Sequence, residues 1–260
     1  MTKCDSDFII VHERKGESIF MEQVKKDFID IINASSNIVF FGGAGVSTES
    51  NIPDFRGTGG LSALDFKYSF EEVLSHDFLF EKTDIFYDFY KKNMLYPNAK
   101  PNGAHIKLAE LEKKGKLISV ITQNIDGLHQ SAGSETVREL HGSIHRNYCI
   151  DCRKEFDLTY IVDSDGVPHC DECGGLVRPD VVLYGEQLDN DVVANAIGDI
   201  KRAEVMIVGG TSLNVYPAAG LLQYFGGNSL ILINKSETPY DRYADLIIRD
   251  PIGKFFLETI

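Results

Sequence analysis

Five short apolar runs, separated by longer segments, constrain the fold of this chain more than any other feature. They are 37–41 (NIVFF), 117–122 (LISVIT), 205–208 (VMIV), 230–233 (LILI) and 246–248 (LII). Runs with so few polar positions are typical of strands in a parallel sheet that is covered on both faces. Apolar residues at helical spacing predict helices at 20–34, 104–114, 189–203 and 218–225. This alternation predicts a doubly wound α/β domain.

Two stretches interrupt the alternation. Residues 61–96 are rich in Phe and Tyr at helical spacing, which predicts a helical insertion. Residues 148–178 hold four of the five cysteines and short strand-like pieces. Because both stretches lie between core strands, we predict a small accessory domain assembled from the two insertions. A cleft between that domain and the strand ends is a natural ligand site.

The cysteines give the strongest chemical signal. Cys149 and Cys152 form one C-x₂-C pair, Cys170 and Cys173 form a second, and 17 residues separate the pairs. This spacing is typical of a four-cysteine zinc site, and four thiolates leave no open position, so the ion is expected to be structural. Disulfides are the weaker alternative because no secretory signal precedes them. A redox role is also weaker, since neither pair opens a helix after a strand.

Charge and hydropathy narrow the range of partners. The chain has 26 Lys and Arg against 39 Asp and Glu, a net charge of −13. Nucleic acids and membrane surfaces are polyanions, so we expect neither as a partner. No segment approaches the roughly 18 apolar residues of a membrane helix, and the N-terminal residues lack an apolar targeting region. We therefore expect a cytoplasmic protein.

Glycine turns follow two of the apolar runs. Gly42-Gly43-Ala44-Gly45 follows the first run, and such a turn lets the backbone approach a pyrophosphate. Thr48 replaces the third glycine of the dinucleotide pattern, so on this stretch alone a plain tight turn is an equal alternative. A second turn begins at Gly209 and carries two hydroxyl groups, and Asn234 ends the next strand. Two sites at two strand ends suit a dinucleotide lying across the sheet.

Three further polar motifs contain candidate ligand-binding or catalytic residues. The loop I-P-D-F-R-G (52–57) pairs an aromatic wall with a guanidinium that can bind phosphate. T-Q-N-I-D-G (122–127) follows a strand directly, where ligand contacts lie in open α/β sheets, although a turn with a cap would look similar. His141 is a candidate general base, but six other histidines compete with it: His12, His76, His105, His129, His145 and His169.

Taken together, these residues resemble the sirtuins, the NAD-dependent protein deacylases, from about residue 20 to residue 256. The resemblance rests on seven motifs in the family's order. They are G-A-G-x-S (43–47), I-P-D-F-R-G, T-Q-N-I-D, H-G (141–142), the two C-x₂-C pairs, V-V-x-[FY]-G-E (181–186) and G-T-S-L-x-V-x-P-A (210–218).

The resemblance implies a Rossmann-like, NAD-binding domain formed by residues 20–57, 101–142 and 179–260. A helical insertion at 58–100 and a zinc-ribbon insertion at 143–178 would form the small domain. NAD would be a co-substrate, one Zn²⁺ ion would be structural, and the partner would be an acylated-lysine protein or peptide. The expected products are nicotinamide, O-acyl-ADP-ribose and free lysine.

The resemblance also implies roles for individual residues. His141 would be the catalytic base, with Asn124 as a second catalytic residue. The acyl-peptide would lie as an added strand between two segments, formed by Val182, Leu183, Tyr184, Gly185 and Glu186 on one side and Leu213, Asn214 and Val215 on the other. The implied NAD-binding residues are Ala44, Gly45, Ser47, Thr48, Phe55, Arg56, Gln123, Asn124, Ile125, Asp126, Thr211, Ser212, Asn234 and Ile252.

Two departures and two alternatives remain open. Tyr184 stands where the family usually has Phe. Members that prefer acidic acyl groups carry a Tyr and an Arg shortly after the I-P-x-F-R-G loop, and residues 60–64 (GLSAL) contain neither, so we expect neutral acyl groups, acetyl above all. The alternatives are a protein mono-ADP-ribosyltransferase and an NAD-binding sensor without turnover. The intact His141, Asn124 and Asp126 favour the deacylase.

Overall fold

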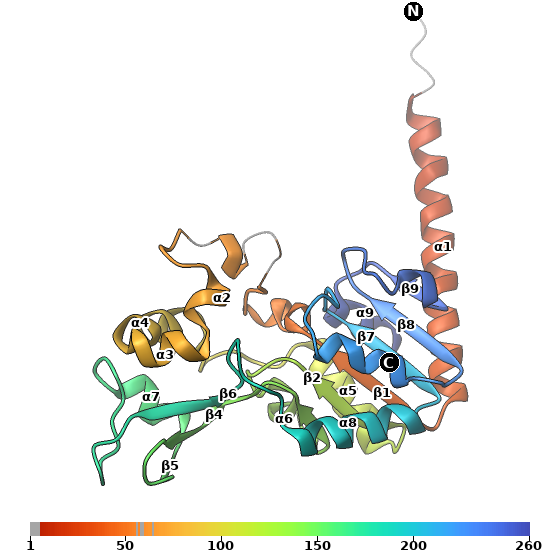
Figure 1. The fold of residues 1–260 in the computed structure, drawn as a ribbon. Coiled ribbons are helices and arrows are strands. Elements are labelled where there is room, and N and C mark those ends of the chain that lie inside the picture. Colours follow the sequence, from red (N-terminus) through yellow and green to blue (C-terminus); the bar gives the residue numbers. More distant parts are fainter. Residues whose placement is uncertain (1–5, 56, 58–59, 64) are drawn as a thin grey trace, which may run out of the picture.

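A six-stranded parallel sheet forms the larger part of the computed structural model, which describes residues 6–55, 57, 60–63 and 65–260. The strand order is β3-β2-β1-β7-β8-β9 (Figure 1). All neighbouring strands run parallel, as predicted from the unbroken apolar runs. The strands are β1 (Ile38–Gly42), β2 (Leu117–Thr122), β3 (Val137–Glu139), β7 (Val205–Gly209), β8 (Ser229–Ile233) and β9 (Leu246–Ile248).

The strand order has a switch point between β1 and β7. The chain builds β1, β2 and β3 outward in one direction and β7, β8 and β9 outward in the other. In doubly wound sheets the ligand crevice lies outside the carboxyl ends of the strands at this point. Gly42 ends β1 and lies in register with Gly209, which ends β7. The two glycine turns found in the sequence therefore start side by side.

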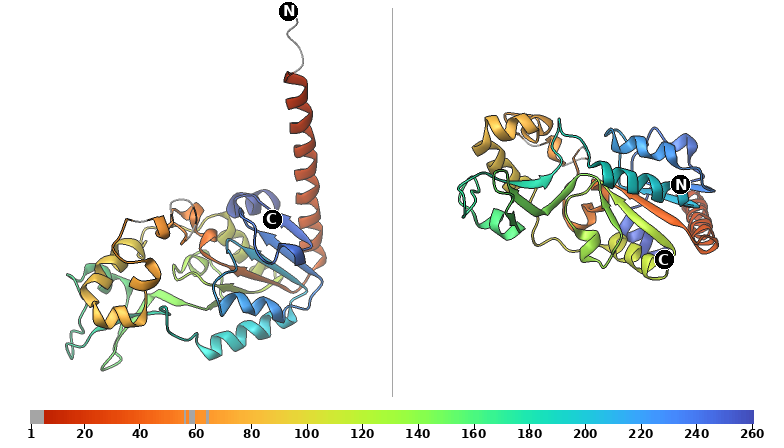
Figure 2. Two further views of the ribbon diagram at one scale, coloured as in Figure 1. Left: turned by 45° about the horizontal axis from the view of Figure 1, so that its top comes forward. Right: turned by 60° about the horizontal axis from the view of Figure 1, so that its bottom comes forward.

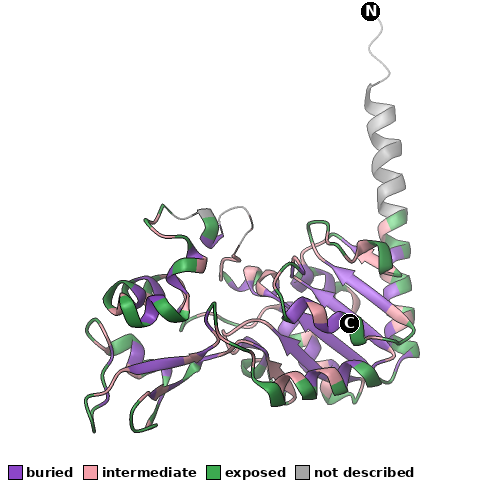
Figure 3. Cartoon of the chain, in the orientation of Figure 1, coloured by how far each residue is buried: buried purple, intermediate pink, exposed green. Residues whose placement is uncertain are grey.

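Helices cover both faces of this sheet, and consecutive residues of β1 point into different cores. Phe40 joins one core with α1 (Ser6–Ala34), α5 (Gly103–Lys113) and α9 (Ile252–Thr259). Phe41 joins the other with α8 (Asn190–Arg202) and the 3-10 helix η4 (Ala218–Tyr224). Figure 3 shows the buried strands between these layers. The predicted doubly wound α/β fold is confirmed.

A second, smaller unit contains the antiparallel sheet β5-β4-β6 (Figure 2). The helices α2, α3 and α4 share one hydrophobic core with it, which includes Phe86 and Tyr90 from α4 and Ile144 and Val177 from the sheet. Two segments far apart in sequence therefore form one packed unit. Its elements are α2 (Phe70–Val73), α3 (His76–Glu81), α4 (Thr83–Asn93), β4 (Gly142–Cys149), β5 (Glu155–Phe156), α7 (Leu158–Asp163) and β6 (Val177–Val181).

Two predicted helices differ from those observed. Helix α1 begins at Ser6 rather than at residue 20 and projects away from the sheet (Figure 1). The apolar pattern marks only its packed turns, where Val24, Phe28 and Ile32 are buried, whereas a helix that has formed can extend beyond its packed turns by adding single hydrogen bonds. The segment after Pro217 is 3-10 rather than α, and Gly220 lowers its helix propensity. No helix within the described ranges is long and apolar enough to cross a membrane.

Short elements complete the chain and lie mostly in the connections. They are α6 (Leu128–Ser131) and the 3-10 turns η1 (Ala44–Val46), η2 (Thr48–Ser50), η3 (Leu61–Ala63) and η5 (Asp241–Tyr243). After β1 come η1 and then η2, and α6 follows the T-Q-N-I-D-G motif at the end of β2. These three elements therefore come soon after the carboxyl ends of two neighbouring strands.

Candidate active site

The two glycine turns pack backbone to backbone at the switch point. The N–H of Gly45 donates to the carbonyl of Gly210 at 2.8 Å, and the N–H of Gly43 donates to that of Gly209 at 3.2 Å. A Cβ atom on Gly45 would lie 2.7 Å from the Cα of Gly210. Gly210 itself has a φ of 58°, which favours glycine. The two turns are far apart in the sequence but pack against each other in the structure, and together they form one side of the candidate site.

A chain of side-chain hydrogen bonds links two of the predicted NAD-binding motifs. The Asn124 amide donates to Ser47 Oγ at 3.0 Å, and Ser47 Oγ donates to Asp126 Oδ2 at 2.6 Å. The other carboxylate oxygen, Asp126 Oδ1, accepts from the N–H of Leu128 at the start of α6. Burial raises the pKa of Asp126, while the bonds from Ser47 and Leu128 oppose that rise. The Asp126 carboxylate is therefore held in one orientation from two sides.

His141 is fixed in one tautomer by the neighbouring motif. Its Nδ1 lies 3.0 Å from the carbonyl oxygen of Gln123. A carbonyl only accepts, so Nδ1 carries the proton and Nε2 is left as the proton acceptor. Burial lowers the pKa of His141, and the Gln123 carbonyl partly opposes this. The imidazole is therefore neutral near pH 7, the state that a general base requires.

Gln123 connects this histidine to the second glycine turn. Its side-chain amide donates to Thr211 Oγ1 at 3.2 Å, and the same hydroxyl oxygen accepts from the N–H of Leu213. Leu213 is buried in the core, with a φ of 56°. Any contact that it makes with a ligand must therefore come from its backbone, whereas Asn214 presents an exposed side chain.

The predicted peptide-binding segment begins beside His141. The N–H of Val182 donates to the His141 carbonyl at 3.0 Å. Leu183 then points into the core of the small unit, and Tyr184 is 37% exposed. The carbonyl of Leu183 accepts from the N–H of Glu186 at 3.0 Å, and Gly185 has a φ of 92°. The segment therefore ends in a tight turn that needs glycine at its third position.

Phe55 lies at the border between the site and the small unit. Its ring centroid is 5.7 Å from that of Phe70. Arg56 and Leu64, from the same loop region, lie outside the residues that the structure describes. Phe70 also lines a cavity of about 540 Å³. Its walls are mixed, with the apolar or aromatic residues Leu61, Phe66, Tyr68, Phe70 and Phe89 and the polar residues Ser62, Lys67, Ser69 and Glu71.

The remaining predicted NAD-binding residues lie close in sequence to the carboxyl ends of the strands of the parallel sheet. Thr48 Oγ1 donates to the Gly45 carbonyl at 3.0 Å and closes the first turn. Asn234 follows β8 directly, and its side chain donates to the carbonyl of Ser236. Ile252 is buried at the start of α9. Ala44 begins η1, Ile125 packs against the core of the small unit, and Ser212 follows Thr211 in the second turn.

Supporting residues that the sequence reasoning missed hold these turns in place. The amide of Asn102, which caps α5, donates to the Val46 carbonyl at 2.8 Å. The carboxylate of Glu49 accepts from the N–H of Gly253 at 2.7 Å, at the start of α9. Asn102 precedes a predicted helix, which is a recognisable capping position. Nothing local to Glu49 indicates a partner 204 residues away.

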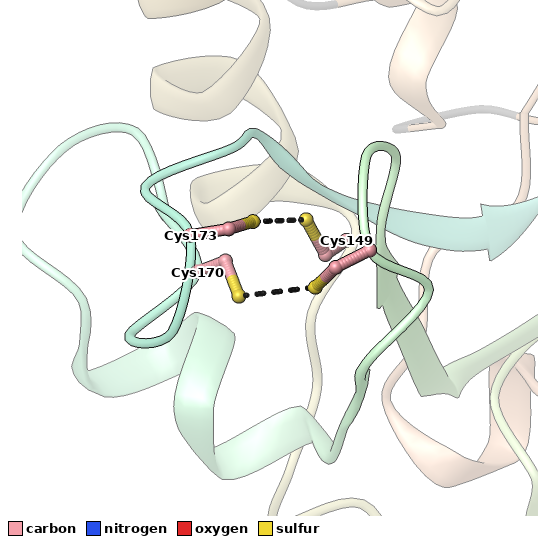
Figure 4. Close-up of side chains that lie close together, drawn as sticks. Cys149, Cys170 and Cys173 are labelled. Atoms are coloured by element: carbon pink, nitrogen blue, oxygen red, sulfur yellow. Dashed lines mark hydrogen bonds between the residues drawn. The ribbon is translucent and has the colours of Figure 1, made fainter.

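The four cysteines converge on one point in the small unit (Figure 4). Their sulfur atoms all lie within 4.8 Å of one another, with 3.4 Å between Cys149 and Cys173 and 3.6 Å between Cys152 and Cys170. A tetrahedral zinc site with Zn–S bonds of about 2.3 Å has sulfur separations of about 3.8 Å. The donor set therefore fits one Zn²⁺ ion, and its four thiolates make the site structural, as predicted.

The comparisons with known proteins identify the family. Residues 43–217 match the Sir2 family, and the chain belongs to it. A Clostridium acetobutylicum protein named NAD-dependent protein deacetylase is 59% identical, and the match covers 88% of this chain and 95% of that protein. A Clostridium tetani protein of the same name is 60% identical, over 88% and 94% of the two chains.

Solved sirtuin structures share the architecture. One described as Sir2 with p53 peptide and NAD+ superposes with a TM-score of 0.79 at 42% identity, covering 90% of this chain and 95% of that one. Another, described with a deacetylated p53 peptide and 3'-O-acetyl ADP ribose, has a TM-score of 0.82 at 44% identity, covering 89% and 95%. The resemblance inferred from the sequence is confirmed.

Proposed function

We propose that this protein is an NAD-dependent protein deacylase that removes acyl groups, chiefly acetyl, from lysine side chains. The products are nicotinamide, O-acyl-ADP-ribose and free lysine. The observation that carries the proposal is His141, a neutral imidazole whose tautomer is fixed by the Gln123 carbonyl beside the switch point. Family membership and relatives named as NAD-dependent protein deacetylases support the same activity.

The site offers distinct surfaces for the different groups of NAD. Ala44, Gly45, Ser47 and Thr48 would bind the pyrophosphate, since helical N-termini and glycine turns present N–H groups to phosphate. Gln123 and Asn124 would hold the reacting ribose, and Ile125 and Asp126 the nicotinamide, with Phe55 as a wall. Arg56 would lie by the phosphates. Thr211, Ser212, Asn234 and Ile252 would line the adenosine half.

The reaction needs positioning more than an enzyme nucleophile. Breaking the bond between ribose and nicotinamide develops positive charge on the ribose, and the oxygen of the acyl-lysine amide then attacks that carbon. Ser47, the serine in this network, is already committed as a donor to Asp126. The residues around the ribose therefore hold the dinucleotide, retain nicotinamide and exclude water.

His141 would act in the next step. Its Nε2 takes a proton from a ribose hydroxyl, and the resulting oxygen attacks the carbon of the alkylamidate. Asn124 would help to orient the ribose, since its amide is held by Ser47. The amine then leaves as free lysine, and one water molecule adds to the acyl carbon, which is still joined to two ribose oxygens. Opening of that ring leaves the acyl group on one ribose oxygen, so NAD, the acylated lysine and one water molecule give nicotinamide, free lysine and O-acyl-ADP-ribose.

The substrate would bind as an added strand between Val182–Glu186 and Leu213–Val215. We further propose that residues 20–57, 101–142 and 179–260 form the NAD-binding domain and that 58–100 and 143–178 form the zinc-binding domain, which agrees with the core shared by the two insertions. A cytoplasmic location suits the four free thiols of the metal site. Cell fractionation tests that location.

The decisive experiment incubates the purified, zinc-loaded protein with NAD and a panel of acyl-lysine peptides. Nicotinamide release that requires the peptide, with O-acyl-ADP-ribose identified by mass spectrometry, is the expected result. ADP-ribose attached to protein would instead identify a mono-ADP-ribosyltransferase. NAD binding without any nicotinamide release would identify a sensor.

A further inference from the structure

The carboxylate of Glu186 lies at the end of the predicted peptide-binding segment, and its acceptor positions are all occupied. Oε1 accepts from Arg178 Nη1 at 2.7 Å and pairs with His76 Nδ1 at 2.8 Å. Oε2 accepts from Arg178 Nη2 at 3.0 Å and from the N–H of Leu183 at 2.9 Å. A carboxylate has about four lone-pair sites. The Glu186 side chain therefore has nothing left to offer a substrate, and only its backbone can contact one.

Arg178 uses four of its five donors. Its guanidinium faces Glu186 in a bidentate pair, the geometry that fixes both orientation and distance. Two further donors reach the carbonyls of Val181 and Pro179 at 3.1 and 3.2 Å. The Arg178 side chain is 10% exposed, and that of Glu186 is 18% exposed. This ion pair is thus largely shielded from water. Through Arg178 it links Val181, which precedes the predicted peptide-binding segment, to Glu186 at the end of that segment.

His76 brings the helical insertion into the same network. Its backbone N–H donates to the carbonyl of Tyr184 at 2.9 Å, while its ring bonds to Glu186. The N–H of Tyr184 in turn donates to the carbonyl of Leu74 at 3.0 Å. The segment is therefore anchored on α3 as well as on β6. Because a carboxylate only accepts, Nδ1 of His76 is the donor.

We propose that Arg178 and His76 are positioning residues for substrate binding, which act through Glu186 to hold the Leu183–Glu186 turn in the shape that an acyl-lysine peptide docks against. The inference rests on the proposed function. In this proposal the Glu186 side chain holds the turn in shape and does not contact the substrate. The same hydrogen bonds join the two insertions. The hydrogen bonds of these side chains reach the Leu183–Glu186 turn and β6 rather than the glycine turns, so their loss should weaken peptide binding and leave NAD binding intact.

Four variants test this inference. Glu186→Gln removes the charge that pairs with Arg178 and turns one acceptor into a donor, and Arg178→Met removes the guanidinium. His76→Leu removes the ring donor, whereas His76→Asn keeps a donor N–H at the same branch of the side chain. Glu81→Gln, an exposed change at the other end of α3, is the matched control.

We expect the KM for an acetyl-lysine peptide to rise at least tenfold in Glu186→Gln and Arg178→Met and about threefold or more in His76→Leu, since unpaired buried charges are costly. The KM for NAD should stay within about twofold, and His76→Asn and Glu81→Gln should resemble the wild type. Peptide KM values within about twofold of wild type, or equal rises for peptide and NAD, would overturn the inference.

A binding measurement separates this inference from the proposed function. Fluorescence anisotropy of a labelled acetyl-lysine peptide reports binding without turnover. A wild type that binds the peptide but releases no nicotinamide would refute the deacylase, while the variants would still test the positioning role. If Arg178→Met fails to fold, the His76 pair and Glu186→Gln carry the test.

Discussion

The rings of His105 and His129 lie 4.7 Å apart between centroids, inclined at 58°, and both side chains are buried. His105 belongs to α5 and His129 to α6, and the ring of Phe40 lies 6.1 Å from that of His129. His105 Nε2 and both ring nitrogens of His129 have no hydrogen-bond partner among the described residues. Burial lowers the pKa of His105 to about 4 and that of His129 well below its usual value.

Because burial lowers the pKa of both histidines, we predict that the protein loses stability in mild acid. Unfolded histidines take up protons below about pH 6.5, whereas His105 resists protonation until about pH 4. The free energy of unfolding should therefore fall as the pH drops from 6.5 towards 4, by about 2 kcal/mol at pH 5 for His105 alone. Urea unfolding of wild type and His129→Leu at several pH values measures this. The variant should lose less stability than the wild type over that range, with zinc content checked at each pH, and parallel curves would contradict the assignment.

Replacement of His141, the proposed general base, should stop deacylation and leave NAD binding intact. His141→Ala is expected to lower deacylation at least a hundredfold, the lower end of general-base contributions, while NAD binding by calorimetry changes little. A general base works only when it is neutral, and burial lowers the pKa of His141. The acid limb of the pH profile of kcat/KM for the wild type should therefore lie below about pH 6.5. Full activity of the variant would refute the role of His141.

The sequence predicted the local features of this molecule well. The runs 117–122 and 246–248 match β2 and β9, because four of the six residues of β2 and all three of β9 are apolar. Strand Val137–Glu139 was missed, since its three residues include an Arg and a Glu and lie at the edge of the sheet. A three-residue strand with two charged residues carries little hydrophobic signal, whereas β9, at the opposite edge, is entirely apolar.

Contacts between distant segments could not be predicted from the residues themselves. The close packing of Gly45 on Gly210 depends on β1 and β7 being neighbours, which no local pattern reveals. The same holds for Arg178 and His76, which appeared in the sequence as an ordinary charge and one of seven histidines. Family resemblance supplied roles for motif residues, whereas the supporting network emerged only from the side-chain geometry.

Loss of one zinc ligand should unfold the small unit. Cys170 is buried, and its sulfur lies 3.6 Å from that of Cys152. Cys170→Ser should therefore lose the metal and most of the cooperative structure around β4 and β6, because structural zinc contributes directly to folding. Metal analysis and limited proteolysis measure both effects, with Ser62→Ala as a control. Zinc retained at one ion per chain would contradict this prediction.

Ser47 should matter through the two hydrogen bonds that it joins. Ser47→Ala leaves the Asn124 amide and the Asp126 carboxylate without their shared partner, which costs about 1–3 kcal/mol when the groups are shielded from water. We expect a rise of about tenfold in the KM for NAD and a further rise in the pKa of Asp126, whose bond from Ser47 holds it down. Steady-state kinetics at varied NAD measures the first effect. Unchanged NAD kinetics would show that the network is not needed for binding.

We predict the acyl preference from residues 60–64, which contain neither a Tyr nor an Arg. A buried succinyl carboxylate without a cation is costly, so we expect acetyl-lysine peptides to react at least tenfold faster than succinyl-lysine peptides of the same sequence. Among the described residues that line the 540 Å³ cavity, Lys67 carries a positive charge, and its ammonium lies 5.0 Å from the centre of the Tyr68 ring. Competition assays with both peptides, in wild type and in Lys67→Met, decide the matter. If Lys67→Met changes the rates with both peptides equally, the result supports a neutral acyl pocket. If the wild type instead reacts faster with the succinyl-lysine peptide and Lys67→Met loses that preference, Lys67 is the partner of the carboxylate and the prediction is refuted.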